Sequence, residues 1–183
     1  AATVRPGARS GTLSRVQLRL PAYATDGRDG VTPMGPHPGQ VRFHTAVAQY
    51  RMYQAGFGGG KSHAGAAEFM RAVMHNTRGL NGRPGKGGLL YLVGAPDYYT
   101  IEIGAWFHLC AWLDEFARLN GWSLDTKRLT SHPRKIFLAT GDEIRFVSFD
   151  RPRKPAGATA GGFWFDESEL CDDPMACLRA LQA

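Results

Sequence analysis

A lysine and a serine that directly follow a run of glycines have the clearest chemical meaning in this sequence. Lys61 and Ser62 close the segment AGFGGGKS, whose glycines are Gly56, Gly58, Gly59 and Gly60. In a phosphate loop, glycines let backbone N–H groups surround a β-phosphate, the lysine reaches the β- and γ-phosphates, and the serine hydroxyl binds Mg²⁺. The pattern GxxxxGK[ST] needs a glycine where this chain has Ala55. We predict a phosphate loop; the alternative is a flexible glycine turn that happens to precede Lys-Ser.

Two adjacent carboxylates at the end of an apolar run form the second candidate group. The run GGFWF ends at Asp166 and Glu167. In a nucleotide hydrolase the first carboxylate holds Mg²⁺ through its water shell and the second polarises the attacking water. The two side chains must therefore point in different directions, which the end of a strand allows. The alternative is that both residues cap the last helix or solvate a loop.

The elements around these residues are predicted from local patterns. The aromatic, alternating segment YRMYQAG predicts a strand before the glycines. Apolar residues at helical spacing predict a helix after Lys61-Ser62; they are Ala66, Met70, Val73 and Met74. The uninterrupted apolar run LLYLVGA predicts a buried strand, and 162–165 a short strand leading to Asp166.

The other predicted elements complete an alternation of helices and strands. They are a short helix in QVRFHTAVAQ, a long helix capped by Asp97 or Thr100 and ended by Asn120-Gly121, a hairpin of 135–140 and 144–149, and a last helix opened by Pro174 after Asp172 or Asp173. This alternation predicts an α/β sheet protein.

Length and composition limit the class of protein. The 183 residues correspond to one domain, and a hydrophobic fraction of 43% excludes wholesale disorder. We expect an irregular arm rich in Gly, Pro and Arg over 1–37 and one domain over 38–183. Three cysteines without a CxxC pair indicate neither a zinc site nor a disulfide framework, and no apolar run approaches the length of a membrane span. A net charge of +6 is compatible with nucleic-acid binding but does not decide it.

Several segments, in order, resemble the ATPase domain of the large terminase subunits, the motors that package DNA into viral procapsids. They are HPGQVRFH, YRMYQAGFGGGKSHA, LLYLVGAPDYYT, and GDEIRFVSFD with AGATAGGFWFDESE. The resemblance implies a P-loop NTPase of the additional-strand class, with a mostly parallel central sheet flanked by helices and a core that is incomplete within this chain. It also implies double-stranded DNA, a portal protein and a small terminase subunit as partners, a homo-oligomeric ring, and the cytoplasm of an infected or lysogenic host cell.

The motifs and the resemblance together give a set of expected roles. Lys61 and the N–H groups of 58–60 hold phosphate, Ser62 and Asp166 hold Mg²⁺, and Glu167 orients water. The resemblance adds Gln40 as the residue that contacts adenine. The full nucleotide-binding set is Gln40, Gly56, Gly58, Gly59, Gly60, Lys61, Ser62 and His63, with ATP and Mg²⁺ as cofactors.

The sequence departs from the family at two arginines. Many members carry Arg at the positions of Phe57 and Ala156, and either could supply the arginine finger that neutralises charge in the transition state. The nearest planar cation is Arg153, which we expect to reach the ATP of a neighbouring subunit; the catalytic set is thus Glu167, Lys61 and Arg153. Two alternatives stay open: a helicase-like ATPase acting on nucleic acid, and a nucleotide-binding module without turnover.

Overall fold

The computed structural model describes residues 36–48, 51–55, 59–76, 88–150 and 160–177, together with residue 21 and the pieces 24–25 and 33–34. Within this part of the chain, the elements are β1 (Ala24–Thr25), β2 (Pro33–Met34), α1 (Pro38–Thr45), α2 (Lys61–Asn76), β3 (Leu90–Ala95), α3 (Tyr98–Ile101), the π-helical turn η1 (Glu102–Trp106), α4 (Phe107–Asn120), β4 (Asp125–Leu129), β5 (Lys135–Leu138), β6 (Glu143–Ser148), β7 (Ala160–Phe165) and the 3₁₀ turn η2 (Ser168–Leu170). The fold is α/β, as predicted.

Five of the strands form one mixed sheet in the order β4-β5-β6-β3-β7. Strand β3 lies parallel to both β6 and β7, whereas β5 is antiparallel to β6 and to β4. The prediction of a mostly parallel sheet is therefore wrong for the β4–β5–β6 half. Short connections join these three strands, and such connections permit only antiparallel pairing, because parallel neighbours need a long crossover. The predicted hairpin is confirmed as β5 and β6.

The strand predicted in YRMYQAG is not formed over the residues of this segment that the structure describes, 51–55. Residues 51–55 have no regular secondary structure, and β7 is the outer strand of the sheet in the described part of the chain. A strand requires a hydrogen-bonded neighbour, and no described strand pairs with this segment. Its side chains contact helices instead: Arg51 pairs with Glu68 of α2, with 2.5 Å between Nη1 and Oε1.

The edge strand β4 was not predicted from the sequence. Its five residues, DTKRL, are mostly polar and half-buried or exposed. Polar edge strands lack the apolar alternation on which strand prediction depends. Its pairing with β5 is what makes it a strand.

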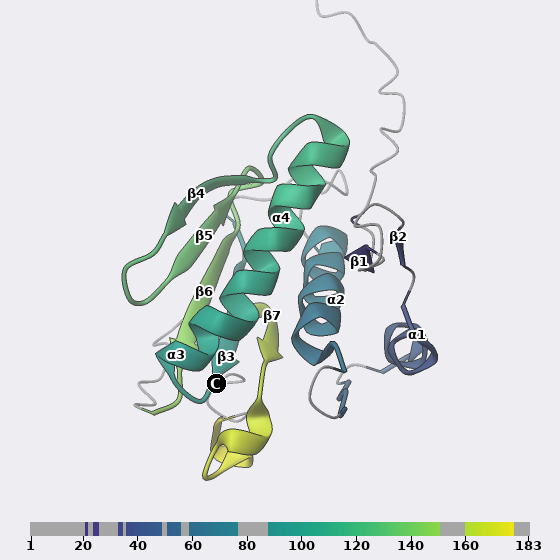
Figure 1. The fold of residues 1–183 in the computed structure, drawn as a ribbon. Coiled ribbons are helices and arrows are strands. Elements are labelled where there is room, and N and C mark those ends of the chain that lie inside the picture. Colours follow the sequence, from purple (N-terminus) through teal and green to yellow (C-terminus); the bar gives the residue numbers. More distant parts are fainter. Residues whose placement is uncertain are drawn as a thin grey trace, which may run out of the picture.

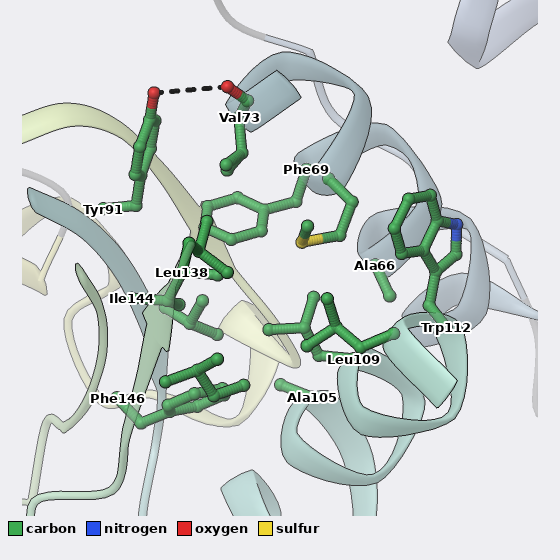
Figure 2. Close-up of a cluster of buried hydrophobic side chains, with 14 of the residues drawn as sticks. Ala66, Phe69, Val73, Tyr91, Ala105, Leu109, Trp112, Leu138, Ile144 and Phe146 are labelled. Carbon is green, nitrogen blue, oxygen red and sulfur yellow. Dashed lines mark hydrogen bonds between the residues drawn. The ribbon is translucent and has the colours of Figure 1, made fainter. Parts of the chain in front are cut away.

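The hydrophobic core lies between the sheet and the pair α2 and α4. Figure 1 shows α4 lying across the sheet with α2 beside it, and α2 also packs against β7. Alternate residues of the strands point into this core, and Figure 2 shows several of them meeting the helices. They are Tyr91, Val93 and Ala95 of β3, Ile136 and Leu138 of β5, and Ile144 and Phe146 of β6. The helices contribute Ala66, Phe69, Met70 and Val73 from α2 and Leu109, Trp112, Leu113 and Phe116 from α4.

The predicted long helix is present but contains an irregular turn. Asp97 is its N-cap, with its Oδ1 accepting a hydrogen bond from Thr100 N at 2.7 Å, and Gly121 ends it in the left-handed conformation with φ of 72°. The π-helical turn η1 separates α3 from α4, and periodicity did not predict it. At the other predicted helix, 174–177 is helical and Asp173 caps it. None of the helices in the described ranges combines the length and apolarity needed to cross a membrane.

Candidate functional site

The lysine and serine of the predicted phosphate loop begin a helix. Helix α2 starts at Lys61, and its first turn contains no acidic residue of its own. The partial positive charge of its N-terminus therefore favours acidic groups brought from elsewhere in the fold. Gly60 immediately before it has φ of +68°, a backbone conformation that favours glycine. An added Cβ there would lie 2.8 Å from Gln40 Nε2. The turn into α2 thus favours glycine at 60, and a side chain there would displace the carboxamide of Gln40.

The two candidate carboxylates lie directly after β7. Asp166 continues the pairing with β3, because its N–H donates to Gly94 O at 2.8 Å. Glu167 then takes φ of 49°, in the left-handed region, and begins the turn that leads into η2. A non-glycine residue in this region is uncommon, and it separates the directions of the two neighbouring side chains.

The fold brings these carboxylates to Lys61. Lys61 Nζ lies 3.5 Å from Glu167 Oε2 and 2.8 Å from Glu169 Oε1. The hydrogen bond to Glu169, together with the charges of Glu167 and Glu169, raises the pKa of Lys61 above its ordinary value, and Lys61 in turn lowers the pKa of Glu169. Sequence reasoning missed Glu169. Its position two residues after Glu167, in DESE, is the signal that could have indicated it.

Asp166 is the most deeply buried acidic group at the site. Its relative exposure is 4%, and burial raises the pKa of its carboxyl to about 6, although a hydrogen bond from the neighbouring Ser62 hydroxyl opposes the rise. Its Oδ2 is buried and has no hydrogen-bond partner in the part of the chain that the structure describes. A buried carboxylate oxygen without a partner is costly unless a cation or donor completes it.

The donor set around Asp166 fits a magnesium ion. Ser62 and Asp166 together offer a hydroxyl and a carboxylate, the hard oxygen ligands that Mg²⁺ prefers, and the unpartnered Oδ2 is available to it. No group of three or more His, Cys, Asp or Glu residues that could hold a metal occurs within the described ranges. This small protein donor set is compatible with Mg²⁺, which usually completes its coordination with waters and substrate phosphates.

Gln40 lies against the loop, where both ends of its carboxamide have partners. Its Oε1 accepts a hydrogen bond from His37 N at 3.0 Å, which caps α1, and its Nε2 donates to Gly60 O at 3.4 Å. Tyr53 and His37 contact the same loop, because Tyr53 Oη donates to Gly59 O at 3.4 Å and lies 2.9 Å from His37 Nε2. The start of α1 is thus fixed to the loop before α2.

A buried glutamate ties this segment to α2. Glu68 of α2 bonds His44 of α1 through its Oε2 at 2.6 Å and Arg51 through its Oε1 at 2.5 Å. Arg51 and Arg71 also donate to His44 O, at 3.4 and 3.3 Å. Sequence reasoning did not single out Glu68, since its partners lie 24 and 17 residues away and only the tertiary structure joins them.

Other predicted site residues lie elsewhere. His63 is directed toward α4, because its ring meets that of His108 edge-on, with centroids 5.7 Å apart. Burial lowers the pKa of His63. Gly56, Gly58 and Arg153 lie outside the described residues, as do Phe57 and Ala156. The structure therefore joins Gln40, Gly59, Gly60, Lys61, Ser62, Asp166 and Glu167 around the start of α2.

The raised pKa of Asp166 predicts how its replacement changes stability. The folded state binds this proton more tightly than the unfolded chain, whose ordinary pKa is 3.8, so the free energy of unfolding falls as the pH rises from about 4 through about 6. In the presence of a chelator at pH 7.5, we expect Asp166→Asn to raise the free energy of unfolding by up to about 3 kcal/mol, since one pKa unit corresponds to about 1.4 kcal/mol.

Urea denaturation of wild type and variant at pH 4 and pH 7.5 measures this difference. At pH 4 the two proteins should differ little, because the folded state then holds the carboxyl in its neutral form and no buried charge remains for the substitution to remove. An Asp166→Asn variant that is less stable at pH 7.5 and equally less stable at pH 4 would show that the ionised carboxylate carries no penalty.

Comparison with known protein families, curated proteins and solved structures gives no match to this chain. The arrangement around Lys61 and Asp166 is therefore interpreted from its own chemistry.

Proposed function

We propose that this chain is a P-loop ATPase domain of the additional-strand class, which hydrolyses Mg-ATP and uses the reaction to move DNA, as a large terminase subunit does. One observation carries the nucleotide part of the proposal. The pair Lys61-Ser62 at the start of α2 lies against Asp166-Glu167 at the end of β7, although Lys61 and Glu167 are 106 residues apart in the chain. This is the juxtaposition of phosphate-binding and metal-binding groups that nucleotide hydrolysis requires.

Each residue has a distinct role in the proposed reaction. The amine of Lys61 and the N–H groups before α2 bind the β- and γ-phosphates, and the helix N-terminus favours their negative charge. Ser62 and Asp166 hold Mg²⁺, which neutralises charge that develops on the phosphates. Glu167 accepts a proton from the attacking water. To reach this water, its carboxylate must move away from the amine of Lys61. Gln40 contacts adenine beside the loop.

The role in DNA movement is supported by the ordered motifs of the sequence and by the net charge of +6. Double-stranded DNA, a portal protein and a small terminase subunit are the proposed partners. Arg153 of a neighbouring subunit in a ring is the proposed finger.

Measurements on the purified protein separate the proposed activities. Fluorescent-ATP titration with Mg²⁺ or with a chelator tests binding, and phosphate release with and without double-stranded DNA tests turnover and its coupling. Absence of Mg-dependent ATP binding would overturn the proposal. Binding without phosphate release, with DNA and procapsid present, would assign a nucleotide-binding module in its place.

The ion pair between Lys61 and Glu169 predicts competition with the nucleotide. Glu169 Oε1 lies 2.8 Å from Lys61 Nζ and occupies the amine that the phosphates need. Because half of the Glu169 side chain is exposed, the pair contributes little to stability. We expect Glu169→Gln to tighten ATP binding about two- to fivefold, in line with the loss of an exposed ion pair of up to about 1 kcal/mol.

Titration of both proteins with fluorescent ATP at low and at high salt measures the effect. The difference should shrink at high salt, since salt screens the competing pair. Asp114→Asn serves as the control, because Asp114 is an exposed carboxylate on α4 that pairs with Arg128 of β4 and not with Lys61. Equal or weaker ATP binding by Glu169→Gln would show that Glu169 does not compete.

A further inference from the structure

The π-helical turn η1 lies within the helix that follows β3. It covers Glu102–Trp106 and joins α3 to α4. A π-helical turn includes more residues per turn than an α-helix, so it displaces backbone outward, and such turns occur frequently at functional sites. Gly104 is at its centre.

Gly104 packs directly against the proposed metal-binding groups. A Cβ added at Gly104 would lie 3.0 Å from Asp166 Oδ2 and 3.9 Å from Ser62 Oγ. The same Oδ2 is buried and has no hydrogen-bond partner in the described residues. The backbone of η1 thus covers the carboxylate oxygen that a cation would approach, and any side chain at position 104 would press against that oxygen.

A buried arginine holds both ends of the turn. Arg134, which is 8% exposed, bonds Glu102 through its Nη2 at 3.1 Å to Oε1, and its guanidinium lies over the ring of Trp106 at 5.0 Å. Glu102 is the first residue of η1 and Trp106 the last. Trp106 also packs edge-on against Phe146 of β6, with ring centroids 5.1 Å apart. These contacts fix the turn to the sheet, and so fix the position of Gly104 over Asp166.

We infer that η1 is a positioning element for the metal site, in which Gly104 keeps side-chain atoms away from Asp166 Oδ2 so that this oxygen can turn to a metal ion, and Arg134 holds the turn in place. This inference rests on the proposed function, because it concerns the same Mg²⁺. The roles of Gly104, Glu102, Trp106 and Arg134 lie outside the phosphate loop and the two carboxylates. Gly104 acts through Asp166 and does not itself bind the metal.

The substitution Gly104→Ala tests the inference by two measurements, metal affinity and thermal stability, of which only the first should change substantially. Mn²⁺ takes the place of Mg²⁺ in this experiment, and a non-hydrolysable ATP analogue is present at saturation. Because the added methyl group crowds Asp166 Oδ2, we expect the Mn²⁺ concentration for half-saturation to rise about tenfold, as for other changes beside metal ligands. Electron paramagnetic resonance of protein-bound Mn²⁺, read against the signal of Mn²⁺ and the analogue without protein, measures it. Alanine is also the better helix former, which offsets the crowding, so thermal stability with a chelator should change little.

Gly162→Ala is the matched control. Its Cβ would meet only Tyr91, at the ordinary contact distance of 3.6 Å, and Gly162 lies on β7 four residues before Asp166. We expect this variant to bind Mn²⁺ as the wild type does. Arg134→Lys keeps the charge but loses the planar stacking on Trp106, and we expect it to weaken Mn²⁺ binding in the same direction as Gly104→Ala.

The outcomes distinguish this inference from the proposed function. If the wild type binds the analogue with Mn²⁺ and Gly104→Ala binds both as tightly, η1 has no positioning role and the inference is overturned, while the ATPase proposal stands. Gly104→Ala could instead bind the metal more weakly and also be less stable than the wild type in the presence of a chelator, by a similar free energy. The role of Gly104 would then be structural, and the inference would also fail. If the wild type binds no Mn²⁺ with the analogue, the proposed function itself is wrong.

Discussion

Substitution of Glu167 by Gln is expected to leave ATP bound while hydrolysis falls about 10²–10⁴-fold, the contribution of a positioned general base. Gln has the size and shape of Glu but cannot accept a proton from the attacking water. The left-handed backbone at position 167 makes equal demands on both residues, so the turn after Asp166 should persist. Phosphate release at saturating ATP, beside fluorescent-ATP titration, measures the two effects separately.

Glu115→Gln is a suitable control for this experiment. Glu115 is on α4 and pairs with Arg118 at 2.6 Å on the surface, so its replacement should change neither binding nor hydrolysis. Simultaneous loss of ATP binding and hydrolysis in Glu167→Gln would indicate a structural role for Glu167. Unchanged hydrolysis would mean that another group activates the water.

The largest effect on nucleotide affinity is expected from Lys61→Ala. This variant removes the amine that we propose to bind the β- and γ-phosphates, and a hydrogen bond to a charged group contributes roughly 1.5–3 kcal/mol, so affinity for ATP should fall roughly 10- to 100-fold. Turnover should fall to background, because in the proposed reaction the same amine neutralises charge in the transition state. Titration and phosphate release are the measurements.

Lys127→Ala provides the matched comparison. Lys127 is an exposed lysine on β4, at the opposite edge of the described sheet from β7. Its replacement by Ala removes one positive charge, as Lys61→Ala does, but away from the candidate site. We expect wild-type ATP binding and turnover from it. Wild-type hydrolysis by Lys61→Ala would contradict the assignment of a phosphate loop, whereas equal losses in both variants would indicate a general effect of charge.

Prediction from the sequence was accurate where a local pattern decides an element. The run LLYLVGA became β3, helical spacing after Lys61 became α2, and Asn120-Gly121 ended α4. Prediction from the sequence was inaccurate where pairing between strands decides an element. Residues 51–55 carry a strand pattern but pair with no strand in the described ranges, while the polar β4 becomes a strand through its pairing with β5. Pairing also decides strand direction, and the β4–β5–β6 half of the sheet is antiparallel.

By itself, the sequence determined the α/β class and the residue types of the candidate site, because apolar periodicity, glycine content and the order Lys-Ser and Asp-Glu are properties of neighbouring positions. Only the tertiary structure decided that Lys61 meets Glu167 and Glu169, that Gly104 of η1 lies against Asp166, and that Glu68 joins α1 to α2. These contacts join residues up to 108 positions apart. They depend on the parallel pairing of β3 with β7 and on the packing of helices over the sheet, and no pattern within a short window of sequence specifies either.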